Sequence, residues 1–260
     1  MNLIALPAFA DNYIWLLHDG AQAVVVDPGD EAPVRAALDA QGLALAGILV
    51  THHHPDHVGG VDALRPSLRG HVYGPAREKI PGPFIPLHDG DTVEVLGMRF
   101  SVIDVPGHTA GHIAYLQQGA ADAEPTAPML FCGDTLFSAG CGRLFEGTPA
   151  QMNASLERLA ALPDDTQVCC THEYTLSNLR FAAAVEPGNT ARAEYEQHCR
   201  ARREAGLPTL PSSIGLERRI NPFLRCDEPE VVASALAQGA ASDEAVAVFT
   251  ALREWKNRFR

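Results

Sequence analysis

The chain has few positively charged residues for its length, and this shortage argues against polyanionic binding partners. Its 260 residues contain 20 Lys and Arg against 32 Asp and Glu, which gives a formal net charge of −12. The sequence pI is about 5.3. Because no long basic run occurs, the sequence offers no match to a nucleic-acid backbone or an anionic membrane surface. We therefore expect neither as a partner, and any anionic ligand must be met by local basic residues.

Long apolar runs and paired cysteine motifs are also missing. No uninterrupted hydrophobic stretch approaches the ~20 residues that cross a bilayer. The first ten residues lack the basic segment of a secretory signal, and Asp11 follows at once. The 6 cysteines show no C-x-x-C spacing, and a chain of this size needs no disulfide framework. We expect reduced thiols in a cytoplasmic, monomeric protein.

The 46% hydrophobic content is enough for a full core. Short, often β-branched runs predict buried strands, and longer patterns with a period of 3.6 residues predict helices. The predicted strands are residues 13–17, 23–26, 48–50, 100–105, 113–116, 129–132 and 167–170. The predicted helices are residues 32–41, 61–68, 149–162, 176–185, 190–205, 228–237 and 242–259.

Strands and helices alternate up to about residue 173, whereas helices dominate afterwards. This change predicts a catalytic α/β domain at residues 1–172 and a helical domain at residues 173–260. The segment 207–214, rich in proline and serine, connects helices of the second domain. Residues 117–128 are expected to form a surface loop.

The most informative segment is Thr51-His52-His53-His54-Pro55-Asp56-His57, followed by Val58 and two glycines. It places four imidazoles and a carboxylate directly after a predicted strand. Imidazole and carboxylate suit divalent metal ions such as zinc, iron and manganese. A polar loop or an accidental histidine run is the alternative, but the H-x-H-x-D-H spacing supplies two separate pairs of ligands.

Three other predicted strands also run into possible ligands: His108, Asp134 and His172. Sites in layered α/β proteins form at the carboxyl ends of strands, so these side chains are expected to converge. Each of the three, taken singly, could equally be a loop or cap residue. Together with His52, His54, Asp56 and His57 of the first segment, they give five histidines and two aspartates, too many for one catalytic zinc with about three protein ligands. Two ions that share a carboxylate fit this number of ligands better.

These motifs resemble those of the metallo-β-lactamase superfamily, and more closely those of its hydroxyacylglutathione hydrolase (glyoxalase II) family. The resemblance is carried by segments spread along the whole chain. They are residues 26–29 (VDPG), 51–60 (THHHPDHVGG), 106–112 (PGHTAGH), 133–137 (GDTLF), 139–148 (AGCGRLFEGT), 171–175 (THEYT) and 252–259 (LREWKNRF). The resemblance implies a four-layer αββα sandwich with a smaller helical domain after it.

The resemblance also implies a ligand set for two divalent ions, with zinc favoured over iron or manganese. His52, His54 and His108 would bind the first ion, Asp56, His57 and His172 the second, and Asp134 would bridge them. A hydroxide would complete the bridge, so that Asp56 and Asp134 act with it in catalysis. Asp27 would brace the ligand loop or merely form a turn. His53 receives no ligand role, and His112 is a structural or supporting histidine.

For the glutathione part of a substrate, the family pattern implies Arg143, Tyr174, Arg253 and Lys256. Arg253 and Lys256 are three residues apart and would share one face of a helix. Their alternative role is to complement the dipole at a helix C-terminus. Phe145 stands where some relatives carry tyrosine, and a phenyl ring cannot donate a hydroxyl hydrogen bond.

The implied reaction is hydrolysis of S-(2-hydroxyacyl)glutathione, chiefly S-D-lactoylglutathione, to glutathione and the hydroxy acid in methylglyoxal removal. A thiolate leaves without a dedicated acid, and the sequence has no G-x-S-x-G nucleophile motif. The cysteines are interpreted as packing residues. The alternative is a glutathione persulfide dioxygenase that uses one iron; Arg253, Lys256 and the helical tail favour the hydrolase. A lactonase, β-lactamase or RNA-processing hydrolase, or a non-catalytic metal-binding protein, is favoured less.

Overall fold

The structure is a computed structural model that describes residues 1–118 and 127–259. The chain forms two compact units. The first comprises Met1–Asp104, Ala110–Gly133 and Cys169–His172, and the second comprises Val105–Thr109, Asp134–Val168 and Glu173–Arg260. The second unit therefore contains not only the helical residues after 172 but also two segments from the region expected to be catalytic.

The first sheet of the first unit has the order β1-β2-β3-β4-β5-β6. Its strands are β1 (Asn2–Ala8), β2 (Asn12–His18), β3 (Gln22–Val26), β4 (Ala44–Leu49), β5 (Leu68–Pro75) and β6 (Ile85–Leu87). The pairs β1/β2 and β2/β3 are antiparallel, and β3 to β6 are parallel. All residues of β2 are buried, which explains the uninterrupted apolar run at residues 13–17.

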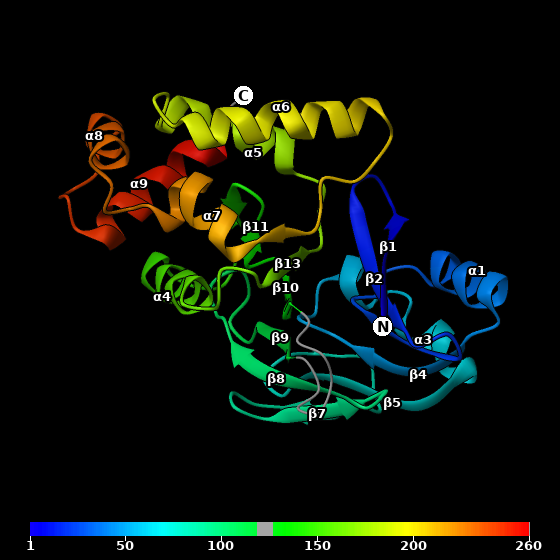
Figure 1. The fold of residues 1–260 in the computed structure, drawn as a ribbon. Coiled ribbons are helices and arrows are strands. Elements are labelled where there is room, and N and C mark those ends of the chain that lie inside the picture. Colours follow the sequence, from blue (N-terminus) through cyan, green and yellow to red (C-terminus); the bar gives the residue numbers. More distant parts are fainter. Residues whose placement is uncertain (119–126, 260) are drawn as a thin grey trace. The chain divides into compact units, whose positions relative to one another are not determined.

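Helices cover one face of this sheet. They are α1 (Glu31–Gln41), α2 (Pro55–Val58) and α3 (Val61–Leu64), followed by a 3₁₀ turn at Arg65–Ser67. The Asp30 side chain caps α1 by accepting from the Ala32 N–H, and Gly42 ends the helix with φ 66°. Helices α1 and α3 lie near the strands of this sheet (Figure 1). Leu38 of α1 and Leu64 of α3 join the same apolar core as Ile48 of β4.

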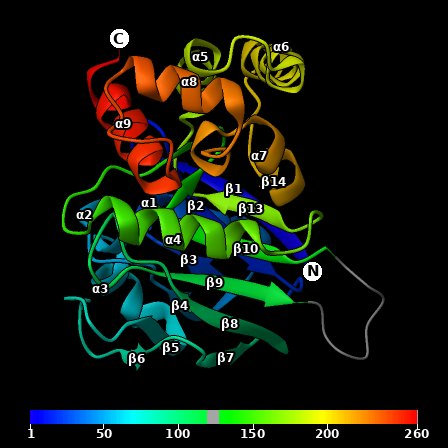
Figure 2. The ribbon, with the colours of Figure 1, turned by 90° about the vertical axis from the view of Figure 1, so that its left-hand side faces the viewer.

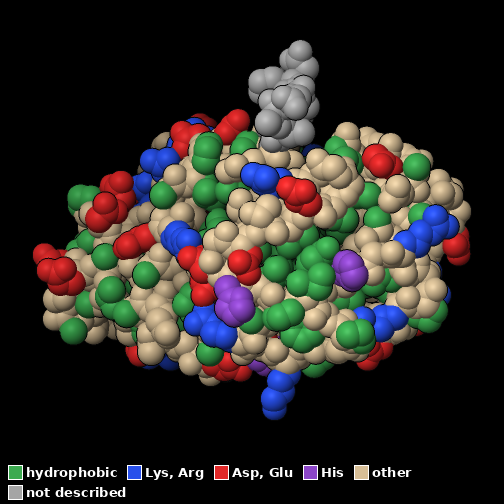
Figure 3. Space-filling model, turned by 90° about the horizontal axis from the view of Figure 1, so that it is seen from below, with side chains coloured by type: hydrophobic (Ala, Val, Ile, Leu, Met, Phe, Trp, Pro, Cys, Tyr) green, Lys and Arg blue, Asp and Glu red, His purple; other side chains and the backbone are tan. Residues whose placement is uncertain are grey.

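The second sheet of the first unit is antiparallel through β7 (Thr92–Val95), β8 (Met98–Asp104), β9 (Ile113–Gln118) and β10 (Met129–Gly133). Figure 2 shows β8, β9 and β10 running side by side. The face over β5, β7 and β8 carries acidic and basic side chains interspersed with apolar ones (Figure 3). This distribution is consistent with the absence of long basic runs in the sequence.

Strand β13 (Gln167–Cys170) passes from the second unit into the first. It leads to Thr171 and His172, which contact the beginning of β2. The Tyr13 N–H donates to the Thr171 carbonyl at 2.6 Å, and Asn12 forms an isolated antiparallel bridge with His172. The turn between β1 and β2 is thereby fixed beside His172.

The second unit is mainly helical. Its helices are α4 (Pro149–Ala160), α5 (Thr175–Val185), α6 (Thr190–Glu204), α7 (Ile214–Ile220), α8 (Pro229–Ala237) and α9 (Ala245–Arg258), with a 3₁₀ turn at Pro222–Leu224. A small hairpin joins β11 (Leu136–Phe137) to β12 (Gly140–Cys141), and β14 (Ser212–Ser213) pairs with β13. Helix α4 begins with a complete capping box between Thr148 and Gln151.

Most predicted elements are present with ends shifted by a few residues, but one helix is shorter than expected. The pattern at residues 61–68 predicted a single helix, whereas α3 ends at Leu64 and Leu68 already begins β5. Pro66 lacks a backbone donor, so a regular helix cannot continue through it. Gln117 and Gln118, which were expected to begin a surface loop, belong to β9 instead. Residues 119–126 lie outside the described part of the chain.

Among the described residues, no helix is both long and apolar enough to cross a membrane.

Candidate functional site

The segment after β4 brings His52 and His54 together in the first unit. Their Nε2 and Nδ1 atoms lie 3.1 Å apart, and the His52 side chain is fully buried. Two nitrogens bound tetrahedrally to zinc at about 2.0–2.1 Å would lie roughly 3.3 Å apart. The separation of the two ring nitrogens is therefore compatible with a shared metal ion.

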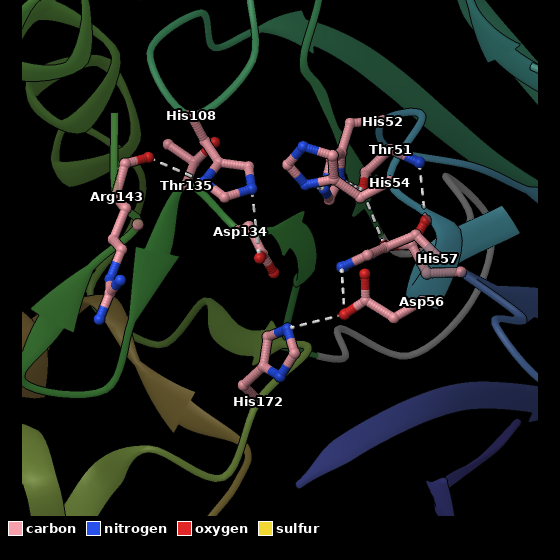
Figure 4. Close-up of polar contacts among 12 residues, drawn as sticks. Thr51, His52, His54, Asp56, His57, His108, Asp134, Thr135, Arg143 and His172 are labelled. Atoms are coloured by element: carbon pink, nitrogen blue, oxygen red, sulfur yellow. Dashed lines mark hydrogen bonds and ion pairs between the residues drawn. The ribbon is translucent and has the colours of Figure 1, made fainter. Parts of the chain in front are cut away.

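A second group in the first unit consists of Asp56, His57 and His172. Asp56 Oδ2 lies 3.6 Å from His57 Nε2 and 3.6 Å from His172 Nε2 (Figure 4). One possible ligand atom from each residue lies within 4.8 Å of the others. Residues distant in sequence thus place a carboxylate oxygen and two imidazole nitrogens in a coordination-sized triangle.

Acceptors behind the rings fix their orientation. The Asp27 carboxylate lies 3.0 Å from His57 Nδ1, and it also accepts from the Thr51 N–H and hydroxyl, both at 2.7 Å. Asp11 Oδ1 lies 2.8 Å from His172 Nδ1. An acceptor at Nδ1 favours the tautomer whose Nε2 lone pair can bind a metal. This geometry agrees with the predicted bracing role of Asp27, whose backbone has φ 52°.

The second unit brings His108 and Asp134 together in the same manner. His108 Nε2 lies 3.4 Å from Asp134 Oδ2, and His108 Nδ1 lies 2.8 Å from the Arg143 carbonyl oxygen (Figure 4). Since that carbonyl can only accept, His108 carries its proton on Nδ1. Its Nε2 is therefore available as a ligand.

The donor chemistry in both units fits a divalent metal site. Imidazole Nε2 atoms face carboxylate oxygens, while their Nδ1 atoms contact oxygen acceptors. This combination of an inner ligand and an outer acceptor is typical of metal-binding histidines. A merely structural histidine needs no such convergence of neighbouring donors.

Several residues around the predicted ligands were not anticipated from the sequence. Asn12 Nδ2 donates to Asp56 Oδ2 at 3.0 Å, and Asp11 contacts His172. The buried Glu78 carboxylate accepts from the His53 N–H at 2.6 Å and from the Gly111 N–H at 3.1 Å. The only local signal was the Asp-Asn pair, a common turn sequence, because these roles depend on contacts between distant segments.

His53 and His112 are likewise placed by the structure. His53 Nδ1 lies 2.8 Å from Glu78 Oε2. His112 is fully buried just before β9, and its ring stacks on His52 at a centroid distance of 4.5 Å. Both positions agree with supporting roles.

A cavity of about 470 Å³ lies within the second unit. It is lined by predicted metal ligands, by all four predicted substrate-binding residues and by aromatic side chains. The lining residues are His108, Asp134, Phe137, Cys141, Arg143, Phe145, Tyr174, Ser177, Asn178, Arg253, Lys256, Asn257 and Phe259. A volume of this size is typical of small-molecule sites.

Positive charge is concentrated in this cavity. Burial is the main cause that lowers the pKa of Lys256 to about 8, and the nearby Arg253 and Arg180 lower it further. The ammonium donates to the Ser177 carbonyl at 3.1 Å and lies 5.4 Å from the centre of the Phe181 ring. A partly desolvated cation of this kind gains from an anionic ligand.

Arg253 is held more tightly than the sequence suggested. Its side chain is 5% exposed, and Nη1 donates to the Cys141 carbonyl at 2.8 Å and to the Gly142 carbonyl at 3.4 Å. Nη2 donates to Asn257 Oδ1 at 3.2 Å. These contacts fix the plane of the guanidinium at the cavity wall.

Cys141 and Phe145 complete the description of the cavity wall. Burial raises the pKa of the Cys141 thiol, although Arg253 opposes the shift; the thiol is thus a poor nucleophile, in agreement with a packing role. The Phe145 ring is 63% exposed and lies 5.2 Å from the His108 ring.

Comparison with protein families covers almost the whole chain. Residues 9–172 match the model of the metallo-beta-lactamase superfamily. Residues 173–259 match the model described as the hydroxyacylglutathione hydrolase C-terminus.

Similar curated proteins carry the same description along their full length. A hydroxyacylglutathione hydrolase of Albidiferax ferrireducens is 60% identical over 259 residues and is covered completely, as is this chain. The hydroxyacylglutathione hydrolase of Pseudomonas putida strain GB-1 is 56% identical, again with complete coverage of both. That of Cupriavidus taiwanensis is 54% identical and covers 98% of each chain.

Solved structures confirm the fold. ETHE1 from Myxococcus xanthus is 29% identical with a TM-score of 0.62 and covers 85% of this chain and 84% of its own. TTHA1623, solved in a di-iron-bound form, is 30% identical with a TM-score of 0.58 and covers 86% of this chain and all of its own. The expected metallo-β-lactamase fold with a helical C-terminal region is thereby confirmed.

Proposed function

We propose that this chain, which belongs to the hydroxyacylglutathione hydrolase family of the metallo-β-lactamase superfamily, hydrolyses S-(2-hydroxyacyl)glutathione. S-D-lactoylglutathione is the chief expected substrate, and glutathione and D-lactate are the products, as in the second step of methylglyoxal removal. One observation carries the proposal: the cavity of the second unit is lined both by candidate metal ligands and by candidate glutathione-binding residues.

We propose that seven side chains hold two divalent metal ions. The first ion would be held by His52, His54 and His108, the second by Asp56, His57 and His172, and Asp134 would be shared. When bound, such ions lower the pKa of a water molecule and polarise the acyl carbonyl. The orientation of the histidines supports this assignment, and so does the di-iron-bound form of TTHA1623. Zinc is the proposed native metal, with iron and manganese as alternatives.

The protein side chains around these ligands would orient them. Asp27 and Asp11 hold the Nδ1 protons of His57 and His172, and Asn12 holds one oxygen of Asp56. Asp56 therefore keeps a fixed carboxylate plane. In this proposal, Asp56 and Asp134 are the acidic residues closest to the chemistry.

The four cavity residues would bind the glutathione part. Lys256 and Arg253 supply positive charge for a carboxylate, Arg143 adds a more exposed cation, and Tyr174 offers a hydroxyl. Phe145, without a hydroxyl, would contribute only apolar contact. Because a thiol titrates near 8.5, the glutathione thiolate can leave without a protein acid.

The decisive test is hydrolysis of S-D-lactoylglutathione by the metal-loaded protein, followed as loss of thioester absorbance. We expect turnover that disappears after chelation and returns with zinc. Asp134→Ala should lose bound metal and activity together, because it removes the shared ligand. A folded, fully metallated protein without thioesterase activity would overturn the proposal.

Glutathione persulfide dioxygenase activity is the second candidate, and it predicts a different readout. It would require one iron and would consume oxygen while forming sulfite. The match of residues 173–259 to the hydroxyacylglutathione hydrolase C-terminus favours the hydrolase. Oxygen uptake with glutathione persulfide, measured on the iron-loaded protein, separates the two.

The proposed setting is a reducing cytoplasm, without nucleic-acid or membrane partners and with a monomeric chain. All six cysteines are buried free thiols, as such a compartment permits.

A further inference from the structure

The hairpin β11–β12 has a backbone conformation that its own sequence does not favour. Ala139, in the turn, has φ 55° and is fully buried. Alanine in the left-handed region is strained because its Cβ crowds the backbone. Something outside the hairpin must therefore hold it in this shape.

The side chain of Glu217 in α7 provides one such restraint. It is fully buried. Its Oε2 accepts from the Ala139 N–H at 2.7 Å, and its Oε1 accepts from the Ser138 hydroxyl at 3.0 Å. The Ser212 hydroxyl and Asn221 Nδ2 donate to the same carboxylate.

These contacts differ from those of a buried ion pair. The donors to Glu217 are hydroxyls, a side-chain amide and a backbone N–H. Burial raises the pKa of the carboxyl, and the hydrogen bonds counter part of that shift. Removing a carboxylate from water is unfavourable, so the presence of Glu217 here indicates a specific role for its accepting oxygens.

Two asparagines extend the same restraint to the hairpin carbonyls. Asn221 Nδ2 donates to the Phe137 carbonyl at 3.1 Å and to the Gly140 carbonyl at 2.9 Å. Asn178 Nδ2 of α5 donates to the Ser138 carbonyl at 3.0 Å. A side chain of α5 and that of the residue directly after α7 therefore satisfy backbone groups that a short hairpin leaves open.

The hairpin leads directly into the cavity wall. The carbonyls of Cys141 and Gly142 accept from Arg253, and the Arg143 carbonyl contacts the His108 ring. Cys141, Arg143 and Arg253 all line the cavity. A shift of the hairpin would thus move the Arg143 side chain and the carbonyls that accept from Arg253. It would also move the Arg143 carbonyl that contacts the ring of His108, a candidate metal ligand.

We propose that Glu217 is a positioning residue for glutathione binding: its carboxylate oxygens hold the Ser138–Ala139 turn so that Arg143 and Arg253 keep their places. This inference rests on the proposed function, because it names glutathione as the ligand whose binding depends on the turn. Glu217 itself lies outside the cavity lining.

A matched pair of serine variants provides the first test. Ser138 and Ser212 each donate one hydroxyl to the same Glu217 oxygen, but only Ser138 belongs to the hairpin. We expect Ser138→Ala to weaken binding of S-methylglutathione, an unreactive thioether, by about fivefold, the effect of one hydrogen bond. Ser212→Ala should leave the Kd unchanged. Wild-type affinity in Ser138→Ala, or an equal loss in both variants, would overturn the proposal.

Substitutions at Glu217 separate acceptor geometry from charge. Glu217→Gln keeps an acceptor for the Ala139 N–H, and the serine hydroxyls can rotate to accept from its amide; its Kd should stay near that of the wild type. Glu217→Met has similar length but no carboxylate oxygens, and should weaken binding at least tenfold. Glu186→Met is the control, since Glu186 is a buried glutamate paired with Arg225; it should lower the melting temperature and leave the Kd unchanged.

Amide hydrogen exchange of residues 136–142 gives a readout that needs no substrate. In the metal-loaded protein, the amides of residues 136–142 should exchange faster in the Ser138→Ala variant than in the Ser212→Ala variant. If the wild type neither binds S-methylglutathione nor hydrolyses the thioester, the proposed function fails, while the exchange data still report whether Glu217 holds the turn. If exchange rises but the Kd does not, the turn is held for stability alone and the positioning role is wrong. The serine pair decides the question even if Glu217→Met does not fold.

Discussion

The candidate metal-binding histidines differ in the acceptor that lies beside Nδ1, the ring nitrogen that faces away from the proposed metal. His57 and His172 have carboxylates at Nδ1, from Asp27 and Asp11, whereas His108 has the carbonyl of Arg143. A carboxylate makes the opposite nitrogen more basic than a neutral carbonyl does. His57 and His172 are therefore expected to be more strongly donating ligands than His108.

Lys256 gives a pH dependence to the proposed substrate binding. Its pKa of about 8 lies below the ordinary 10.5, chiefly because of burial. The ammonium is therefore present below pH 8 and lost above it, so that attraction for a substrate carboxylate falls as the pH rises. We expect kcat/KM to decline by about tenfold between pH 7 and 9.5, through a rise in KM.

Lys256→Arg is the variant that isolates this effect. Arginine stays charged throughout this range, so the alkaline rise in KM should disappear. KM measured at intervals across the range, corrected for spontaneous thioester hydrolysis, provides the test. If KM rose equally at alkaline pH in the wild type and in Lys256→Arg, the titrating group would be one other than Lys256.

At the scale of elements, the N-terminal strand pair acts on the ligands through its turn. The turn between β1 and β2 carries Asp11 and Asn12, which contact His172 and Asp56. The backbone of β2 is joined to Thr171. The first strands of the chain therefore belong to the support of the site as well as to the core.

Asp11→Asn should weaken metal binding without unfolding the protein. The neutral amide is a poorer acceptor for His172 Nδ1, and losses of a supporting acceptor cost about 10- to 100-fold in metal affinity. Titration of the metal-free protein with zinc, followed by calorimetry, measures the change. Asp19→Asn is the control, because Asp19 is an exposed turn residue bonded to the Ala21 and Gln22 N–H groups. Equal zinc affinity in all three proteins would contradict the role of Asp11.

Elements with strong local patterns were predictable, and those made by tertiary contacts were not. The buried strand β13 agrees with its predicted range, because an apolar run between turn residues needs no other information. The hairpin β11–β12 and the short helix α7 were missed. Ala139 has a positive φ and donates its N–H to the distant Glu217, and no pattern in residues 136–141 encodes that contact.

For the molecule as a whole, the candidate ligands come from segments as distant as His52 and His172. Bound metal stabilises only the state in which such segments are together, so metal content and folding are linked. The unfolded chain, which lacks the arrangement, binds metal more weakly.

Removal of metal should lower the melting temperature by roughly 5–10 °C. This corresponds to the ~2.7 kcal/mol lost when a ligand at 100 times its Kd is withdrawn, at about 2–4 °C per kcal/mol for a chain of this size. Calorimetry with parallel metal analysis, before and after dialysis against a chelator, checks it. Zinc should restore the transition and magnesium should not. An unchanged melting temperature in verified metal-free protein would show that bound metal does not stabilise the folded state.

The sequence predicted the residue types of the site better than their surroundings. The H-x-H-x-D-H motif and the strand ends identified the candidate ligands, since metal chemistry restricts the usable side chains. Asp11, Asn12 and Glu78 remained unpredicted, because a buried acceptor behind a ring leaves no spacing rule in the sequence. The structure likewise shows Arg253 bonded to backbone carbonyls, which its position on a helix could not indicate.

The restraint of the β11–β12 hairpin has a consequence for recombining relatives. The two family models meet between residues 172 and 173, which makes this junction the obvious place to join halves of two homologues. Yet the turn lies before the junction, and Glu217, Asn221 and Asn178 lie after it. A chimera would keep its modules intact and still separate the turn from the side chains that shape it. The turn and the side chains that hold it therefore form one unit that is discontinuous in sequence, and we expect an exchange to keep the turn only when the second parent supplies equivalent side chains at these three positions.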